Sequence, residues 1–193
     1  GLFDVCVAPV LVQQGLLPSM GAAPSKQGNW RDIRLLADWH VFFARPLLID
    51  LGGIAKGFAV DAAIHALRRG GCSEGAVNAG GDLRRFGLHA ETIHLRRGND
   101  LVPIAQLRRG AVATSSPNCV EVPIGEGAIG HILEPLSGKH WRGTGSVMVA
   151  ARTCVMADAL TKVAALAGPA CRPLLDRFGA QAYWDCPARC MSS

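Results

Sequence analysis

The segment IDLGGIAKGFAVD, residues 49–61, decides how the middle of the chain folds. It begins in a short apolar stretch, Leu47–Leu51, that is typical of a strand, and Gly52-Gly53 then allows a sharp turn. From Ile54 to Arg69 the apolar residues recur at helical spacing, and Gly70-Gly71 ends that run. The segment therefore predicts a strand, a glycine turn and a helix in direct succession.

The start of this helix is a candidate anion site. Free backbone N–H groups at a helix start favour negative charge, and glycines let a phosphate approach the backbone. Lys56 adds a positive charge in the first turn. The pattern is not that of a P-loop, and a tight turn with an exposed lysine explains the same residues equally well. This segment alone leaves both interpretations open.

Short strands and a few helices make up the rest of the chain. A buried strand or turn is expected at Phe3–Val7 and a helix-like stretch from Pro9 to Leu17, followed by strands at Ala76–Asn78, Thr92–Leu95, Ile104–Leu107, Ala111–Thr114, Gly130–Leu133, Ser146–Ala151 and Ala180–Trp184, and by helices at Val155–Leu166 and Arg172–Phe178. Runs of strands mixed with few helices favour an α+β class over a regular βαβ repeat. We expect one domain over residues 1–193, with an irregular tail after residue 185.

Composition narrows the class of protein. A hydrophobic fraction of 49% with only 18% charged residues argues against disorder, and no apolar run is long enough to predict a membrane-spanning helix. The net charge of +5 comes from scattered arginine pairs, at positions 68–69, 84–85, 96–97 and 108–109. Aromatic residues do not alternate with these pairs, which argues against a nucleic-acid surface. Solvated element ends explain the pairs, and so does a phosphate-bearing molecule or an acidic partner.

Two glycine-rich or hydroxyl-rich segments carry further polar side chains. In AVNAGGDLRRFG, residues 76–87, the glycines between two strands indicate a bulge or a close backbone approach, with Asp82 capping a turn. In VATSS, residues 112–116, Thr114, Ser115 and Ser116 can donate hydrogen bonds to phosphate oxygens. His131, in the following HILEP segment, is either a general base or a structural side chain.

The segment MADALTKVAAL, residues 156–166, places an acid in an apolar helix. Thr161 and Lys162 follow Asp158 at i+3 and i+4, so the three side chains share one helix face. An acid and a hydroxyl at this spacing can hold Mg²⁺, which prefers oxygen ligands. The alternative is an Asp158–Lys162 ion pair on a solvated face, and the surrounding Met, Val and Ala residues favour the functional interpretation.

Taken together and in this order, six segments resemble the ApbE family, the FAD:protein FMN transferases. They are GLFDVCVAPV at 1–10, IDLGGIAKGFAVD at 49–61, VNAGGDL at 77–83, VATSS at 112–116, HILEP with Ser137-Gly138 at 131–138, and ADAL at 157–160. The resemblance implies an α+β, two-lobed fold of mixed or antiparallel sheets with packed helices, and a cleft for FAD between the lobes. It also implies that the N-terminal part of the family fold is missing before Gly1.

The resemblance implies a function as well. Family members bind FAD and transfer its FMN moiety, through the phosphate, to a threonine or serine of a partner flavoprotein, with release of AMP. The alternatives are a Mg²⁺-dependent FAD pyrophosphatase and a non-catalytic flavin-binding relative. Family members act on the periplasmic face of the inner membrane, so we expect membrane association only through an anchor upstream of Gly1.

The resemblance assigns roles residue by residue. Expected FAD contacts are Leu2, Phe3, Asp4, Asp50, Lys56, Thr114, Ser115, His131 and Ile132. Expected catalytic residues are His131, Lys56 and Asp158, and expected Mg²⁺ ligands are Gly53, Asp158 and Thr161. One departure concerns Lys162, which stands where many members have a threonine ligand. We therefore hypothesise that the Lys162 ammonium neutralises the pyrophosphate in a metal-sparing site.

Overall fold

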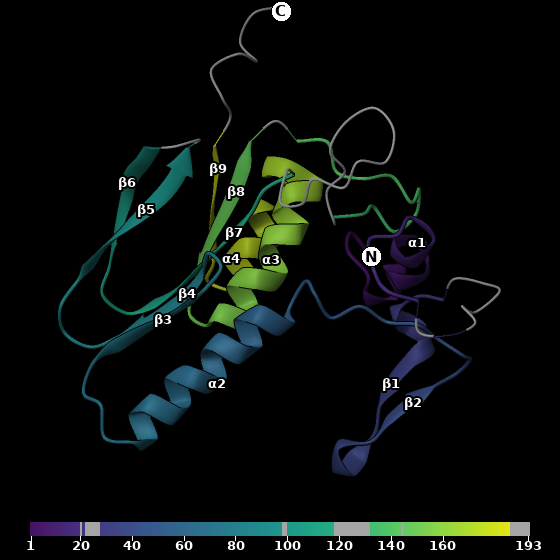
Figure 1. The fold of residues 1–193 in the computed structure, drawn as a ribbon, viewed down its shortest axis with the longest axis horizontal. Coiled ribbons are helices and arrows are strands. Elements are labelled where there is room, and N and C mark those ends of the chain that lie inside the picture. The colour runs from purple at the N-terminus through teal and green to yellow at the C-terminus, as the bar shows by residue number, and fades with distance from the viewer. Residues whose placement is uncertain (20, 22–27, 98–99, 118–131, 144, 186–193) are drawn as a thin grey trace, which may run out of the picture.

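An antiparallel five-stranded sheet forms the centre of the protein (Figure 1). The structure is a computed structural model that describes residues 1–19, 21, 28–97, 100–117, 132–143 and 145–185. The strand order is β3-β4-β7-β8-β9. The strands are β3 Gly75–Ala79, β4 Asp82–Phe86, β7 Gly110–Ser115, β8 Ser146–Ala151 and β9 Gln181–Asp185. The predicted α+β class is confirmed, and the sheet supplies the frame on which the functional segments lie.

Helices cover one face of the sheet and a hairpin covers the other. The helices are α2 Ala55–Arg69, α3 Cys154–Ala167 and α4 Arg172–Arg177, and the hairpin is β5 Glu91–Arg97 with β6 Asp100–Leu107. Residues of β7 alternate between the two layers. Ala111 and Ala113 pack with Cys154 and Ala157 of α3, whereas Val112 packs with Ile93 and Leu95 of β5. Both faces of β7 are therefore buried, and its ends are where polar sites can form.

The Cys154–Arg177 stretch is long and apolar enough to cross a membrane by length and hydropathy alone. Half of its most apolar window is nevertheless buried in the fold. Gly168, with φ of 57°, also separates α3 from α4. We therefore read the stretch as core helices of this domain.

The N-terminal part consists of short elements. A 3₁₀ turn at Val5–Val7 leads into α1 Ala8–Gln13, and β1 Ile33–Leu35 pairs with β2 Val41–Phe43. The strand expected at Leu47–Leu51 is wrong. Its backbone makes a single bond to the 3₁₀ turn, from the Asp50 N–H to the Val5 carbonyl at 2.7 Å, and joins no ladder. No described strand lies beside this segment, so its apolar residues pack without forming a sheet.

The glycine pair of the AVNAGGDLRRFG segment forms a hairpin turn rather than a bulge. Ala79 pairs with Asp82 in the register of β3 and β4, which leaves Gly80 and Gly81 as a two-residue loop. Their φ angles are 63° and 98°, in the left-handed region that glycine adopts without strain. The turn therefore fixes Asp82 as the first residue of β4.

Helices α2 and α3 cap one another. The N-cap residues Ile54 and Thr153 make no side-chain cap hydrogen bond. Instead, Asp158 of α3 accepts the Gly57 N–H in the first turn of α2 at 3.0 Å. Asp61 of α2 in turn accepts the N–H groups of Cys154 and Val155 at 2.9 Å each. Each helix thus places a carboxylate at the positive end of the other's dipole.

Gly57 allows this approach because it has no side chain. A Cβ at this position would lie 2.4 Å from the Cys154 carbonyl oxygen and 2.8 Å from the Asp158 Cβ. The backbone carbonyl cannot rotate away as a side-chain tip could. The close contact of the two helix starts therefore depends on glycine.

We predict that Gly57→Ala destabilises the fold by about 2–4 kcal/mol, because the methyl group separates α2 from α3 and stretches both caps. Urea unfolding followed by circular dichroism measures this. The matched control is Gly75→Ala, where a Cβ would meet the Phe86 ring at 3.4 Å and little has to move. Equal stability of the two variants would contradict this account of the helix contact.

Candidate functional site

A cavity of about 290 Å³ lies where the N-terminal segment, the turn before α2, the end of β7 and α3 meet. It is lined by Phe3, Leu17, Asp50, Gly52, Gly53, Lys56, Thr114, Ser115, Ser116, Ile132 and Lys162. Seven of these were predicted to bind FAD or metal, and they come from four separate segments of sequence. The fold therefore brings the predicted segments to one place.

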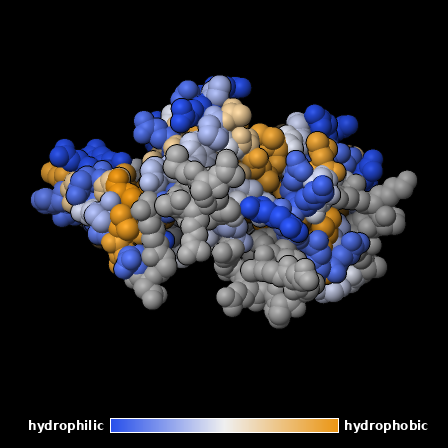
Figure 2. Space-filling view, turned by 90° about the horizontal axis from the view of Figure 1, so that it is seen from above, coloured by the Kyte–Doolittle hydropathy of each residue, from blue (hydrophilic) through white to orange (hydrophobic). Residues whose placement is uncertain are grey.

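Surface hydropathy does not single out this place. On the face drawn in Figure 2, hydrophobic residues reach the surface in several separate groups with hydrophilic side chains between them. The site is marked instead by buried charge.

A buried ion pair forms one wall of the cavity. Asp158 is fully buried, and its Oδ1 accepts a hydrogen bond from the Nζ of Lys162. The ion pair considered from the i, i+4 spacing is thus present, but its expected place on a solvated face is wrong. Lys162 is itself buried except where it lines the cavity. Its ammonium group therefore compensates Asp158 and presents positive charge to whatever fills the cavity.

The Thr161 hydroxyl connects this ion pair to β7. It donates to the Asp158 backbone carbonyl at 2.7 Å, so at the 2.8 Å contact with the Ser115 hydroxyl it is the acceptor. The Ser115 proton is therefore directed at Thr161 and away from the cavity. Thr114 and Ser116 are the neighbouring hydroxyls that also line the cavity.

Lys56 is the second cation of the cavity, and its partner was missed in the sequence. The Lys56 Nζ pairs with the Oδ2 of Asp82, which is fully buried at the start of β4. Among the described residues, the Oδ1 of Asp82 has no hydrogen-bond partner. Asp82 was expected to cap a turn. An acid directly after a two-glycine turn on the helix-covered side of a sheet is the signal that could have identified it.

Two of the helix-start N–H groups considered for an anion already have partners within the protein. The Ala55 N–H donates to the Leu51 carbonyl at 2.8 Å, and the Gly57 N–H donates to Asp158. The anion at this helix start is thus supplied by α3. Positive charge at the cavity comes from Lys56 and Lys162 instead.

The N-terminal residues divide into two groups. The Phe3 ring lies against Gly53, where a Cβ would be 2.7 Å from the ring. Asp4 is buried and accepts the N–H groups of Cys6 and Trp30 at 3.0 Å each. Asp4 and the half-exposed Leu2 are outside the cavity lining. Their predicted flavin contacts remain predictions.

His131 lies outside the described residues, so its predicted role as a base is not placed by the structure. Only the end of the strand expected at Gly130–Leu133 is described. There Leu133 forms a single bridge with His140, and Ile132 is buried and lines the cavity.

Two of the three predicted Mg²⁺ ligands, Gly53 and Asp158, lie at the end of the Lys162 side chain. A Cβ on Gly53 would lie 3.7 Å from the Lys162 Cε, and each Asp158 oxygen already accepts a hydrogen bond. The described residues contain no group of three His, Cys, Asp or Glu side chains able to hold a metal. An ammonium group in contact with Asp158 repels a second cation at short range. The side chains as arranged therefore fit an ammonium better than Mg²⁺.

The chain resembles known proteins over nearly its whole length. The sequence profile of the ApbE family matches residues 1–184. The structure resembles the ApbE protein of Thermotoga maritima at a TM-score of 0.80 and 30% identity, covering 95% of this chain and 67% of that one. No curated protein matches the chain.

Two more distant structures share the fold. The flavinyl transferase ApbE of Pseudomonas stutzeri has a TM-score of 0.74 at 23% identity, with 95% of this chain and 62% of that chain covered. The flavin transferase ApbE of Vibrio cholerae has a TM-score of 0.70 at 22% identity, with 95% and 65% covered. The chain thus spans somewhat less than two thirds of these two proteins.

We predict that Lys162→Met lowers the free energy of unfolding by about 3–5 kcal/mol, because it leaves the Asp158 charge buried without its partner. The double variant Asp158→Asn with Lys162→Met removes both charges, so it is expected to recover part of this loss. Chemical denaturation measures both. Lys139→Met, at an exposed lysine, is the matched control, and a Lys162→Met variant as stable as that control would contradict a buried pair.

We predict that Cys154 and Cys6 resist alkylation at pH 8 while exposed Cys72 reacts. Burial raises the pKa of the Cys154 thiol to about 12, with nearby Asp82 and Asp61 adding to the shift, and raises the pKa of Cys6 to about 11. In the unfolded chain the Cys154 thiol ionises near pH 9. The stability that the folded protein has while this thiol is neutral in both states is therefore complete below pH 9, and it is lost as the pH rises toward 12. Peptide mapping after iodoacetamide treatment measures the reactivity, and rapid labelling of Cys154 in folded protein would contradict the burial.

Proposed function

The chain belongs to the ApbE family, and we propose that it binds FAD in the 290 Å³ cavity and transfers the FMN moiety to a threonine or serine hydroxyl of a partner flavoprotein, releasing AMP. The acceptor oxygen forms a bond to the FMN phosphorus as the bond from that phosphorus to the AMP oxygen breaks. The hydroxyl proton passes to a base, and AMP leaves as the anion.

The observation that carries this proposal is the pair of lysines facing one cavity. Lys56 and Lys162 both line it, and each is held by a fully buried carboxylate, Asp82 and Asp158 respectively. Phosphoryl transfer develops negative charge on the transferred and leaving groups, so fixed positive charge is what it requires. A cation already positioned by a buried partner needs little reorganisation when that charge develops.

The remaining lining suits a flavin nucleotide. Phe3, Leu17 and Ile132 supply apolar surface, which favours a flat ring system. Thr114 and Ser116 supply hydroxyls for phosphate oxygens. A cavity of about 290 Å³ holds only part of FAD, so the proposal assigns it the diphosphate and one adjoining group. The assignment of His131 as the base rests on the family resemblance.

We propose further that Lys162 takes over the charge neutralisation expected from Mg²⁺. Its ammonium is in contact with Asp158, the predicted metal ligand, and lies beside Gly53. Transfer should then persist in the presence of EDTA. Strong anomalous density between Gly53 and Asp158 after a Mn²⁺ soak, or activity that is lost in EDTA and restored by Mg²⁺, would overturn this assignment.

We predict that Lys56→Gln lowers the FMN transfer rate by about 100-fold, the size of effect seen when one stabilising donor is removed. The assay follows covalent flavin fluorescence on a partner flavoprotein after denaturing electrophoresis. Lys139→Gln is the control and should leave the rate unchanged. Thermal denaturation of each variant first verifies that it is folded at the assay temperature.

The same reaction mixture separates the alternatives. Free FMN with AMP and no labelled acceptor would identify a pyrophosphatase. Unchanged FAD that co-purifies with the protein would identify a non-catalytic flavin carrier. Either result would overturn the transferase proposal.

A further inference from the structure

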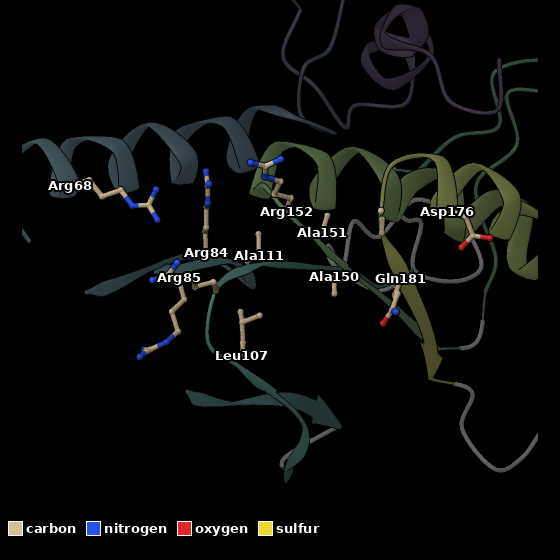
Figure 3. A pocket seen from close by; sticks show the side chains of 14 residues that line it. Arg68, Arg84, Arg85, Leu107, Ala111, Ala150, Ala151, Arg152, Asp176 and Gln181 are labelled. Carbon is tan, nitrogen blue, oxygen red and sulfur yellow. The ribbon is translucent and has the colours of Figure 1, made fainter. Parts of the chain in front are cut away.

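A second cavity, of about 820 Å³, is drawn in Figure 3. It lies at the opposite end of β7 from the cavity of about 290 Å³, which is called the flavin cavity here. The lining of the second cavity includes three cross-strand pairs at one end of β4, β7, β8 and β9, which are Arg85 with Gly110, Ala111 with Ala151, and Ala150 with Gln181. The flavin cavity lies at the other end of β7, at Thr114 and Ser115. The nearest lining residues on β7, Ala111 and Thr114, are three steps apart, which spans about 10 Å, and the two cavities share no lining residue.

Arginine dominates the lining of this second cavity. Arg68, Arg84, Arg85, Arg109 and Arg152 line it, together with a single acid, Asp176. Figure 3 shows Arg68 reaching toward the cavity from α2 and Arg152 near the start of α3, with Asp176 on the far side. Three of the sequence's four arginine pairs contribute to this cluster.

Two of the five arginines are held by acids and shape the cavity. The Arg84 Nη1 pairs with Asp61 at 2.7 Å. The Arg85 guanidinium pairs with Glu91 at 2.9 Å and also donates to the His89 carbonyl. Both guanidinium groups are thus already paired with a carboxylate of the protein.

The other three form no ion pair within the described part of the chain. Arg68 lies over the Phe86 ring, 4.7 Å from its centroid, which leaves its in-plane N–H groups exposed. Arg109 uses only its Nε, donated to the Gly87 carbonyl at 3.2 Å. For Arg152, an exposed residue, no hydrogen bond or ion pair is found among the described residues. These three guanidinium groups therefore share the cavity with a single carboxylate, that of Asp176.

We propose that this arginine cavity binds a small phosphorylated molecule through Arg68, Arg109 and Arg152. Planar guanidinium groups match phosphate oxygens in pairs, and several of them around one concavity favour a multiply charged anion. The lining also includes Ala111, Ala150, Ala151 and Ala180, whose small side chains leave room for a ligand at this end of the sheet. The site does not depend on the proposed flavin chemistry, because it shares no lining residue with the flavin cavity.

Isothermal titration of the full chain with inorganic pyrophosphate tests the site. We expect saturable binding that weakens at least 10-fold in the double variant Arg109→Gln with Arg152→Gln. Arg177→Gln removes an exposed arginine of α4 outside the lining and should bind as the parent protein does. Because all the altered side chains are exposed, each variant is expected to fold.

Titration in the Lys56→Gln background separates the two cavities, because Lys56 faces the flavin cavity only. The 10-fold weakening caused by the two arginine substitutions should persist in that background, and the double arginine variant should keep its FMN transfer rate. Absence of saturable binding would overturn the proposal, and so would equal pyrophosphate affinities with and without the two arginine substitutions in the Lys56→Gln background. Binding of an oligo-aspartate peptide that pyrophosphate does not displace would also overturn it, since it would indicate a protein partner.

Titration with ADP distinguishes the sources of the phosphate group. Affinity for ADP at least 5-fold above that for pyrophosphate would identify a nucleotide site, because only the nucleoside adds contacts with the apolar part of the lining. Equal affinities would identify a site for the phosphate groups alone.

Discussion

The exchange of carboxylates between α2 and α3 is the interaction on which the rest of the structure depends. Neither helix has a capping side chain of its own, so Asp158 bonds the first turn of α2 while Asp61 bonds the first turn of α3. Unpaired N–H groups at a buried helix end are costly, and each helix removes that cost for the other. This fixes the two helix starts against one another, with Gly57 as the residue that lets them approach.

The same exchange creates the cavity wall. Asp158 is buried because it caps α2, and a buried carboxylate requires a cation, which Lys162 supplies from one turn further along α3. If the ammonium group moved away, Asp158 would be a buried charge without a partner, which is costly. The position of the ammonium group is therefore fixed before any ligand binds. Lys56 is placed by similar physics, since the fully buried Asp82 holds it at the turn end of the β3–β4 hairpin. The Asp158 carboxylate therefore both caps α2 and holds the ammonium group that faces the cavity.

Local pattern predicted the elements well, but the contacts between them depended on tertiary structure. The helix spacing from Ile54 to Arg69 matches α2, Ala55–Arg69, because amphipathic periodicity is a local property. Leu47–Leu51 is as apolar as a strand, yet among the residues that the structure describes no strand pairs with it. The Lys56–Asp82 pair joins residues 26 apart in sequence, and no spacing rule predicts it. The family resemblance selected Gly53, Lys56, Thr114 and Ile132 together, and the fold then brought them to one cavity.

The arginine pairs show why the sequence could not separate structural charge from available charge. Neighbours on a strand point to opposite faces, so Arg84 meets Asp61 on the helix side while Arg85 meets Glu91 of the β5–β6 hairpin. Identical residues side by side thus acquire different partners from different layers. Arg109 lies between β6 and β7, where no layer brings a carboxylate to it among the described residues. A guanidinium group without a carboxylate partner therefore lies where the strands end, and there it can bind an anionic ligand.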